Sequence, residues 1–266
     1  MRLIIPAAGL GVRLTGAAHL PKLLIPLQGR PLISHVLRMV SATARFSQVV
    51  IILGPHYEAV SDTVEGLASR VKWQSDTEVV CIRNPRFETT NNIYSLYLAR
   101  EYIEGDVLIH NCDVLVDPAL IARLASKNDA NRGWVLVEKM SQIPEEETKI
   151  LTKSHDEVAQ IGEEISSSVG EGRYVGVCCF GSEAAKVFRN EVESFFERGE
   201  LGVFYTKVLK ALARRSILGV IWTEGLPWLE IDTLEDLRQS ASKVHEIVSH
   251  TGTPDSGKVS RVRFIE

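Results

Sequence analysis

A turn of small residues near the amino terminus, followed by two cationic side chains, carries the strongest chemical signal in the sequence. The turn follows an apolar, strand-like run and contains four small residues: Ala7, Ala8, Gly9 and Gly11. Small residues let the backbone come close to a ligand, so that its N–H groups can point at phosphate oxygens. Arg13 and Lys22 flank the turn, and two cations there suit a triphosphate whose pyrophosphate departs.

The same turn does not match two common phosphate-binding motifs. The dinucleotide fingerprint G-x-G-x-x-G needs a third glycine where Leu14 stands, and the P-loop pattern G-x-x-x-x-G-K-[ST] is absent. A G-x-G after a strand can also be only a tight turn, with Arg13 and Lys22 as solvated surface cations. The prediction of phosphate binding therefore depends on the glycines and the cations together.

Two aspartates far apart in the sequence each stand next to a predicted strand. Asp113 follows the strand-like run 106–110, and Asp232 lies between the run 228–231 and the last predicted helix, which begins near Thr233. Ligands gather beyond the carboxyl ends of strands in an open α/β sheet, and Mg²⁺ needs only one or two carboxylates besides phosphate oxygens. The sequence predicts a magnesium site at Asp113 and Asp232. The alternatives are a turn for Asp113 and a helix cap for Asp232.

The remaining acids include one candidate for substrate binding and several with structural roles. Glu230, beside Trp228, could supply the counter-charge to a cationic acceptor. Asp117 stands before a proline and should cap the next helix, whereas Asp106 and Asp236 should be solvated surface acids.

Amide and aromatic side chains are further candidates for substrate contacts. Asn91 and Asn92 could meet a cytosine edge or a ribose, because amides both donate and accept hydrogen bonds; capping bonds are the alternative. Aromatic faces with nearby acids bind trimethylammonium groups, which makes four rings candidates for a wall around the acceptor: Trp134, Tyr174, Tyr205 and Trp228. Packing in the core is the commoner use of such rings.

The elements that must position these residues alternate between strand and helix. Short β-branched runs predict strands at Leu3–Ile5, Val49–Leu53, Val79–Ile82, Val107–Ile109, Trp134–Val137, Lys149–Leu151, Tyr174–Phe180 and Ile217–Trp222. Stretches of helical period predict helices at Leu32–Thr43, Tyr57–Leu67, Ile93–Tyr102, Ala119–Ala125, Glu183–Phe196 and Val203–Ala213. This alternation predicts an α/β fold with a Rossmann-like, doubly wound and mostly parallel sheet. Its strands should be buried on both faces.

One domain is expected to span residues 1–250, with one departure from the alternating pattern. Helices drop out between 134 and 180, which predicts a small antiparallel insertion that forms a wall on the acceptor side. Residues 251–266 form a carboxyl-terminal tail, in which a turn-rich linker precedes a short apolar segment. That segment could pair as an edge strand, where it could serve a homodimer, or stay mobile.

Composition and charge exclude several classes of protein. The 266 residues are 45% hydrophobic and 24% charged, as in a globular chain and unlike a disordered, collagenous or coiled-coil one. A net charge of −4 disfavours general binding to nucleic acid or to anionic membranes. No apolar run approaches the roughly 20 residues of a membrane span, and the first run is too short for a signal peptide. A cytoplasmic location is therefore expected.

Three segments together resemble the signature of nucleotidyltransferases that activate sugar phosphates and related small phosphates. They are the turn at 7–14, Pro21-Lys22, and Gly-Arg-Pro-Leu-Ile at 29–33. The resemblance extends over roughly residues 1–240. Residues 91–98, Asn-Asn-Ile-Tyr-Ser-Leu-Tyr-Leu, are similar to the phosphocholine cytidylyltransferase branch, whose relatives include inositol-phosphate and aminoethylphosphonate cytidylyltransferases.

This resemblance implies an enzyme with a nucleotidyltransferase, GT-A-like fold that uses CTP and Mg²⁺. It would transfer CMP to a small phosphorylated or phosphonate acceptor and release pyrophosphate, without a protein nucleophile. The metal-binding aspartates of the family match Asp113 and Asp232. The family often carries a lysine after Ile161-Gly162 that meets the acceptor phosphate, but Glu163 stands there in this sequence. Lys149 matches another lysine of the relatives and could take over that contact.

Three other functions stay open at this stage. The nearest is a sugar-1-phosphate nucleotidyltransferase that uses UTP, dTTP or GTP. The second is a non-catalytic, nucleotide-binding regulatory subunit, which Glu163 makes worth testing. The third is a nicotinamide dehydrogenase, which the missing third glycine disfavours.

Overall fold

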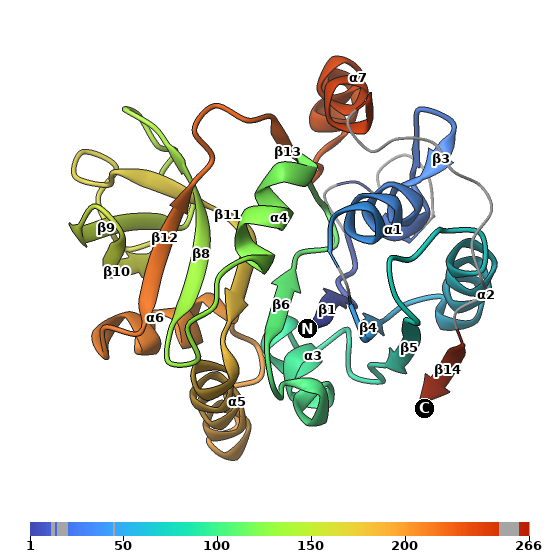
Figure 1. The fold of residues 1–266 in the computed structure, drawn as a ribbon, viewed down its shortest axis with the longest axis horizontal. Coiled ribbons are helices and arrows are strands. Elements are labelled where there is room, and N and C mark those ends of the chain that lie inside the picture. Colours follow the sequence, from blue (N-terminus) through green and yellow to red (C-terminus); the bar gives the residue numbers. More distant parts are fainter. Residues whose placement is uncertain (12–13, 15–20, 45, 250–260, 266) are drawn as a thin grey trace.

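A ten-stranded sheet forms the centre of the molecule (Figure 1). The computed structural model describes residues 1–11, 14, 21–44, 46–249 and 261–265. Its strands run in the order β14-β5-β4-β1-β6-β11-β8-β12-β10-β9. Parallel strands make up one half of the sheet, the other half is mixed, and helices cover both faces. The predicted doubly wound α/β fold with an antiparallel part is therefore confirmed.

The parallel half consists of five strands, namely β1 (Arg2–Ala7), β4 (Gln48–Leu53), β5 (Glu78–Arg83), β6 (Val107–His110) and β14 (Val262–Ile265). β1 lies between β4 and β6, so that Ile4 stands opposite both Val50 and Ile109. Side chains alternate across a strand, and Leu3 and Ile5 therefore join one hydrophobic cluster while Ile4 joins the other. Burial on both faces explains why these strands read as unbroken apolar runs.

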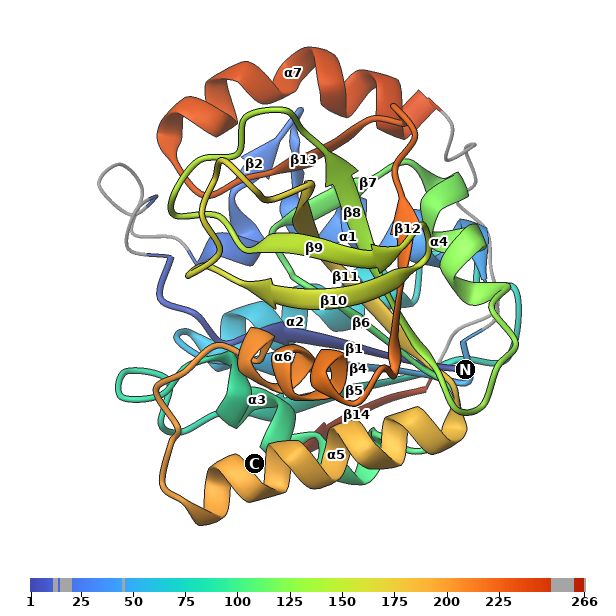
Figure 2. The ribbon, with the colours of Figure 1, turned by 90° about the vertical axis from the view of Figure 1, so that its left-hand side faces the viewer.

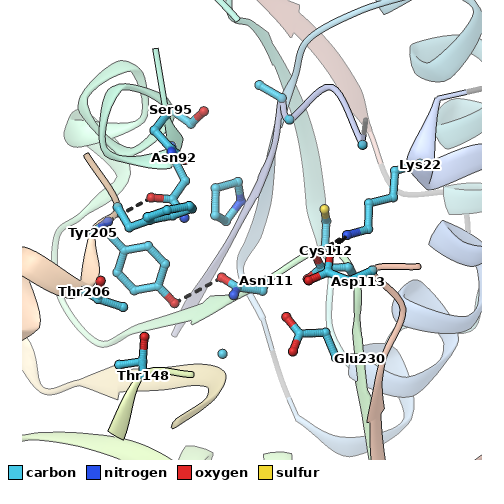
Figure 3. Close-up of a pocket in the computed structure, with 18 of the residues that line it drawn as sticks. Lys22, Asn92, Ser95, Asn111, Cys112, Asp113, Thr148, Tyr205, Thr206 and Glu230 are labelled. Atoms are coloured by element: carbon cyan, nitrogen blue, oxygen red, sulfur yellow. Dashed lines mark hydrogen bonds and ion pairs between the residues drawn. The ribbon is translucent and has the colours of Figure 1, made fainter. Parts of the chain in front are cut away.

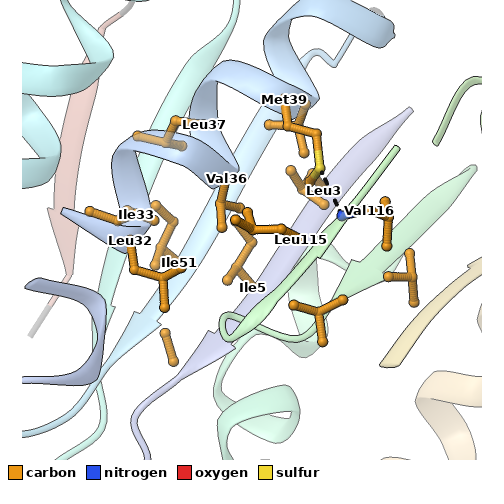
Figure 4. Close-up of a cluster of buried hydrophobic side chains, with 14 of the residues drawn as sticks. Leu3, Ile5, Leu32, Ile33, Val36, Leu37, Met39, Ile51, Leu115 and Val116 are labelled. Atoms are coloured by element: carbon orange, nitrogen blue, oxygen red, sulfur yellow. Dashed lines mark hydrogen bonds between the residues drawn. The ribbon is translucent and has the colours of Figure 1, made fainter. Parts of the chain in front are cut away.

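The described helices form one layer on each face of the sheet (Figures 1 and 2). One layer consists of α1 (Leu32–Thr43), α2 (Tyr57–Ala68), α4 (Pro118–Ala125) and α7 (Leu234–Ser249). The other consists of α3 (Asn92–Leu98), α5 (Ser182–Glu197) and α6 (Thr206–Arg214). Figure 4 shows Val36 and Met39 of α1 beside Leu3 and Ile5 of β1.

The sequence located most helices to within a few residues, with one clear exception. The helix expected at 93–102 ends at Leu98 and is followed by a separate 3₁₀ turn, Arg100–Tyr102. Ala99 has φ −89° and ψ 7°, and the Tyr102 N–H bonds to its carbonyl at 2.9 Å, so the helical ladder tightens there. Asp117 caps α4 as predicted, because its Oδ1 accepts the N–H of Ala119 at 2.8 Å.

The mixed half of the sheet closes on itself. β11 (Gly172–Phe180) is antiparallel to β6 and to β8 (Gly133–Lys139), and β8 is parallel to β12 (Leu218–Trp222). β10 (Glu157–Gly162) pairs with β12 and with β9 (Lys149–Ser154), and β9 pairs back to β11. These pairings form a ring, and Figure 2 shows β9 and β10 lying across β11.

Two small sheets hold connecting segments near the carboxyl ends of the central strands. β7 (Val114–Val116) is antiparallel to β13 (Trp228–Glu230), with Leu115 opposite Leu229. β2 (Pro26–Leu27) pairs with β3 (Arg30–Pro31), just after a 3₁₀ turn at Lys22–Leu24. The β7–β13 pair brings together two segments that are more than a hundred positions apart in the sequence.

The carboxyl-terminal tail supplies an edge strand. β14 runs parallel to β5, with Phe264 opposite Cys81. One of the two alternatives for the apolar segment is therefore confirmed, while the linker at 251–260 lies outside the described residues. None of the helices in the described ranges is both long and apolar enough to cross a bilayer.

Candidate active site

A cleft of about 500 Å³ opens beyond the carboxyl ends of β1 and β6, beside β11 (Figure 3). This is where ligands collect in open α/β sheets. The cleft brings together four predicted residues from distant segments: Lys22, Asp113, Glu230 and Asp232. One of the two predicted cations and three predicted acids therefore share one cleft.

The turn after β1 forms one side of the cleft. Three of its predicted residues line the cavity: Ala8, Gly9 and Gly11. Gly11 has φ +58°, which strains other residues, and a Cβ there would come within 3.3 Å of Lys22 Cβ. Behind the turn, a Cβ on Gly54 would stand 2.3 Å from the Ala8 carbonyl oxygen. Ala7 instead joins the hydrophobic core, and Arg13 lies outside the described residues.

The ammonium group of Lys22 lies between two carboxylates. Its Nζ is 2.5 Å from Asp113 Oδ2 and 2.5 Å from Asp232 Oδ1. Burial disfavours the ammonium form, but Asp113 and Asp232 outweigh burial and hold the pKa of Lys22 well above its usual value. Lys22 is therefore a permanent cation next to the acids.

Three carboxylates converge beside Lys22. One oxygen from each of Asp113, Glu230 and Asp232 lies within 4.8 Å of the others. Burial, together with the charges of Asp113 and Asp232, raises the pKa of Glu230 to about 8. Asp113 Oδ1 is buried and has no hydrogen-bond partner in the described part of the chain. An all-oxygen set with an unsatisfied carboxylate oxygen fits a hard divalent cation.

Backbone pairing and a capping box position these acids. Beyond the β7–β13 ladder, the Ile231 N–H donates to the Asp113 carbonyl at 3.0 Å. Asp236 Oδ2 accepts the N–H groups of Asp232 and Thr233 at 3.1 and 2.8 Å, and Thr233 Oγ1 accepts the Asp236 N–H at 3.1 Å. Thr233 therefore caps α7. The prediction that Asp236 is only a solvated surface acid is wrong, because its carboxylate holds the loop that carries Asp232.

Tyr205, just before α6, organises the amide side chains of the cleft (Figure 3). Its backbone N–H donates to Asn92 Oδ1 at 2.8 Å, and its hydroxyl donates to Asn111 Oδ1 at 3.1 Å. Asn91 Oδ1 accepts the N–H of Asn92 at 2.8 Å, which is the capping bond given as the alternative. Asn91 and Asn92 both line the cleft. With the carbonyl oxygens engaged, their NH₂ groups are what they offer a ligand.

The four rings predicted to form an aromatic wall divide into two pairs. Tyr174 and Tyr205 line the cleft. Trp134 is 7% exposed and belongs to the hydrophobic core. Trp228 is also buried, and the Arg173 guanidinium covers it at 4.4 Å from the ring centre. The structure therefore does not bring either tryptophan to the wall of the cavity. Both rings pack in the core, which was the alternative.

Lys149 has no contact with the cleft. Its side chain is 0% exposed, and Nζ donates to the backbone carbonyls of Glu145, Glu147 and Glu163 at 2.6, 3.1 and 3.0 Å. An ammonium has three N–H donors, and all three are used here. The structure thus places Lys149 as a tie between the loop before β9 and the end of β10, away from the expected acceptor phosphate.

Other lining residues were not singled out from the sequence. They include Asn84, Thr90, Ser95, Asn111, Glu146, Glu147, Thr148 and Phe204, while Glu163, noted in the sequence as a departure from the family, lines the cleft as well. Asn111 follows the same strand end as Asp113, so the strand-end rule could have found it. The acids Glu146, Glu147 and Glu163 reach the cleft because β9 pairs with both β10 and β11. No local pattern in the sequence shows these pairings.

Two curated relatives resemble part of the chain. A CMP-5'-(3-aminopropyl)phosphonate synthase from Streptomyces rubellomurinus is 35% identical over 132 residues, which cover 49% of this chain and 20% of that protein. A 2-C-methyl-D-erythritol 4-phosphate cytidylyltransferase from Ralstonia nicotianae is 33% identical over 135 residues, which cover 49% of this chain and 51% of that protein. The chain thus matches about half or less of the length of these relatives.

Two solved structures share the fold over most of the chain. The inositol-1-phosphate CTP transferase from T. maritima superimposes with a TM-score of 0.78 at 21% identity and covers 95% of this chain and 98% of its own. The CTP:phosphocholine cytidylyltransferase from Streptococcus pneumoniae gives a TM-score of 0.71 at 21% identity, with coverages of 91% and 97%. At this identity the likeness concerns the fold.

The family comparison covers most of the sequence. The family model described as MobA-like NTP transferase domain matches residues 3–214. This range contains the turn after β1, Lys22, Asp113 and every strand of the closed ring except β12. Because the match extends over well more than half of the 266 residues, the chain belongs to the MobA-like NTP transferase domain family.

Proposed function

We propose that this protein is a Mg²⁺-dependent cytidylyltransferase that transfers CMP from CTP to a small phosphorylated or phosphonate acceptor. The observation that carries the proposal is the single cleft that holds Lys22, the glycine turn, and the acids Asp113, Glu230 and Asp232. The names of the relatives and neighbours, which include three kinds of CTP-dependent transferase, support cytosine as the base. Pyrophosphate is the second product.

In the proposed reaction, an oxygen of the acceptor phosphate or phosphonate attacks the α-phosphorus of CTP, and the bond to pyrophosphate breaks. The attacking oxygen is already anionic near neutral pH, so no protein base is needed. Backbone N–H groups at Gly9 and Gly11, with Lys22, would stabilise the leaving pyrophosphate. Arg13, beyond the described residues, is a further candidate for this role.

Asp113 and Asp232, with Glu230 beside them, would hold the metal. A bound Mg²⁺ supplies charge neutralisation for the two anionic reactants. The residues themselves provide an oxygen-only set, and the shared pocket positions both substrates. Removal of a group that neutralises charge on the leaving group typically lowers the rate about 10²–10³-fold. A loss of this size is expected when the ammonium of Lys22 is removed.

The charge of the lining favours an acceptor that also carries an ammonium group. Apart from the acids at the metal site, the cavity is lined by Glu146, Glu147 and Glu163, and Lys22 is the one lysine or arginine among the described lining residues. Acids attract a cationic end and repel a second anion. An aminoalkylphosphonate or phosphocholine therefore suits the cleft better than inositol phosphate, and one curated relative is named for a CMP-aminopropylphosphonate.

A matrix of substrates tests the proposal. Pyrophosphate release is measured for CTP, UTP, dTTP and GTP against 2-aminoethylphosphonate, phosphocholine, phosphoethanolamine, inositol 1-phosphate and glucose 1-phosphate, with and without EDTA. Release with CTP and an ammonium-bearing acceptor, abolished by EDTA and restored by Mg²⁺, is expected. Turnover only with a sugar 1-phosphate and another nucleotide would favour the sugar-nucleotide alternative. Nucleotide binding without any turnover would favour a regulatory subunit.

A further inference from the structure

A chain of buried hydroxyl groups ends on the side chain of Asn111. Tyr205 and Tyr174 are 1% and 7% exposed, and their hydroxyl oxygens are 2.7 Å apart. The Tyr205 hydroxyl donates its one proton to Asn111 Oδ1 at 3.1 Å. The Tyr174 hydroxyl must therefore donate to Tyr205, so the direction of the chain is fixed from Tyr174 to Asn111.

This chain determines which end of the Asn111 amide meets a ligand. The carbonyl oxygen is taken by Tyr205, whereas no hydrogen-bond partner of Nδ2 is found among the described residues. Nδ2 lies against Gly176, where a Cβ would come within 2.7 Å of it, and Gly176 has φ +91°. Both residues line the cleft. Asn111 thus presents an NH₂ donor to the cavity, and the missing Cβ leaves room for it.

We propose that Tyr205 is a positioning residue that holds the Asn111 amide as a donor to the phosphate or phosphonate oxyanion of the acceptor. The inference deepens the proposed function and depends on it for the identity of that oxyanion. The NH₂ group of Asn111 is neutral and can donate a hydrogen bond to an oxyanion, whereas the carboxylates of the cleft repel an oxyanion. Asn111 is two positions before Asp113, and Figure 3 shows it between Tyr205 and Glu230. Lys22, the one lysine or arginine of the described lining, is assigned to the leaving pyrophosphate.

The test separates the hydroxyl of Tyr205 from its backbone. Tyr205→Phe removes the hydrogen bond to Asn111 but keeps the backbone N–H that holds Asn92. Because Asn92 is a predicted nucleotide contact, the KM for CTP serves as an internal control. In Tyr205→Phe the Asn111 amide is no longer held in place as a donor to the oxyanion of the acceptor. The KM for the acceptor is therefore expected to rise about tenfold, because a hydrogen bond to a charged group is weakened. The KM for CTP is expected to stay within about twofold. Asn111→Asp adds repulsion and should raise the acceptor KM by more than about a hundredfold.

Tyr97→Phe is the matched control. Tyr97 stacks on Phe196 at 3.7 Å between ring centres and is not among the residues lining the cleft. This variant should keep both KM values. An unchanged acceptor KM in Tyr205→Phe, or an equal rise in the KM for CTP, would overturn the assignment, because the amide would then serve structure or the nucleotide.

A binding measurement keeps the inference separate from the proposed function. Inorganic phosphate is titrated calorimetrically into the protein in the presence of saturating CMP. Binding to the wild type that weakens about tenfold in Tyr205→Phe, and further in Asn111→Asp, supports the oxyanion site even if no acceptor in the panel is turned over. Absent phosphate binding, or binding that neither variant weakens, would overturn it while leaving a positive substrate panel intact.

Discussion

At the scale of single residues, opposite charges in the cleft stabilise one another. The ammonium of Lys22 contacts Asp113 and Asp232 at 2.5 Å each, and all three side chains are largely buried. A buried charge is costly unless it is paired, so the two carboxylates offset the cost of burying the Lys22 ammonium. The same groups are the ones that a triphosphate and a divalent cation would need.

Asp113→Asn and Asp232→Asn test this arrangement. Each change removes one negative charge and keeps the shape of the side chain, so both variants should fold while pyrophosphate release from CTP falls by about 10²-fold or more. Circular dichroism checks the fold, and a coupled pyrophosphate assay gives the rate. Asp117→Asn is the control, because Asp117 caps α4 away from the cleft and asparagine caps equally well. Turnover like that of the wild type in both cleft variants would eliminate the metal assignment.

His110 makes stability depend on pH. It is fully buried in β6, and burial lowers its pKa from 6.5 to about 4. Below pH 6.5 the unfolded chain takes up a proton that the folded protein does not bind until about pH 4. The free energy of unfolding should therefore fall as the pH drops through this window, by up to about 3 kcal/mol from this group.

Denaturant unfolding at several pH values measures this effect. His110→Leu has similar volume and cannot titrate, so its stability should lack this share of the pH dependence between pH 6.5 and 4. Parallel curves for the wild type and His110→Leu across that window would contradict the prediction.

At the scale of elements, the wall beside the cleft depends on a contact that the sequence does not reveal. Lys149, at the start of β9, ties three backbone carbonyls of the surrounding loops together. Two of those carbonyls belong to Glu147 and Glu163, which line the cleft. Lys149 thus acts on the site through the backbone that carries these acids.

Lys149→Met should lose this tie while keeping the apolar stem. Because it removes three partly buried hydrogen bonds, the free energy of unfolding should drop by about 2–4 kcal/mol, which urea unfolding will measure. Lys153→Met on the same strand is the control. The Lys153 ammonium is exposed, and its one ion pair among the described residues is with Glu157 at 3.4 Å, so the change should be near neutral. Equal stability of the two variants would show that the three bonds of Lys149 contribute little.

At the scale of the whole molecule, the sheet ends in an edge that is exposed along β14. No strand within the described ranges pairs with the outer side of β14, and Phe264 is 42% exposed there. An unpaired strand edge is a template for pairing with another chain. We therefore expect the protein to form a homodimer through this edge.

Sedimentation velocity tests the dimer. The wild type should sediment at twice the 29.5 kDa chain mass, and Phe264→Glu should shift it towards the monomer by placing charge at the edge. Val169→Glu is the control, since Val169 is also exposed, at 55%, but lies before β11. A monomer at all concentrations, or dissociation by the control alone, would refute the use of β14.

The sequence by itself determined the local features of this protein. Unbroken apolar runs and helical periods located the strands and helices because burial and backbone geometry act over a few residues. The rule that ligands gather at strand ends singled out Asp113, and the turn after β1 was visible from its small residues. Where prediction failed locally, as for Asp236, a side chain bonded to backbone N–H groups that sequence spacing did not reveal.

The tertiary structure alone decided which of these residues meet. β7 and β13 are three residues each, and no local pattern shows that they pair, yet their pairing sets Asp113 beside Asp232. The ring closed by β9 and β11 turned Lys149 inward and Glu147 and Glu163 towards the cleft. Tyr205 reached Asn92 and Asn111 across more than ninety positions of sequence. Such contacts form only when distant segments pack together, so no local pattern encodes them.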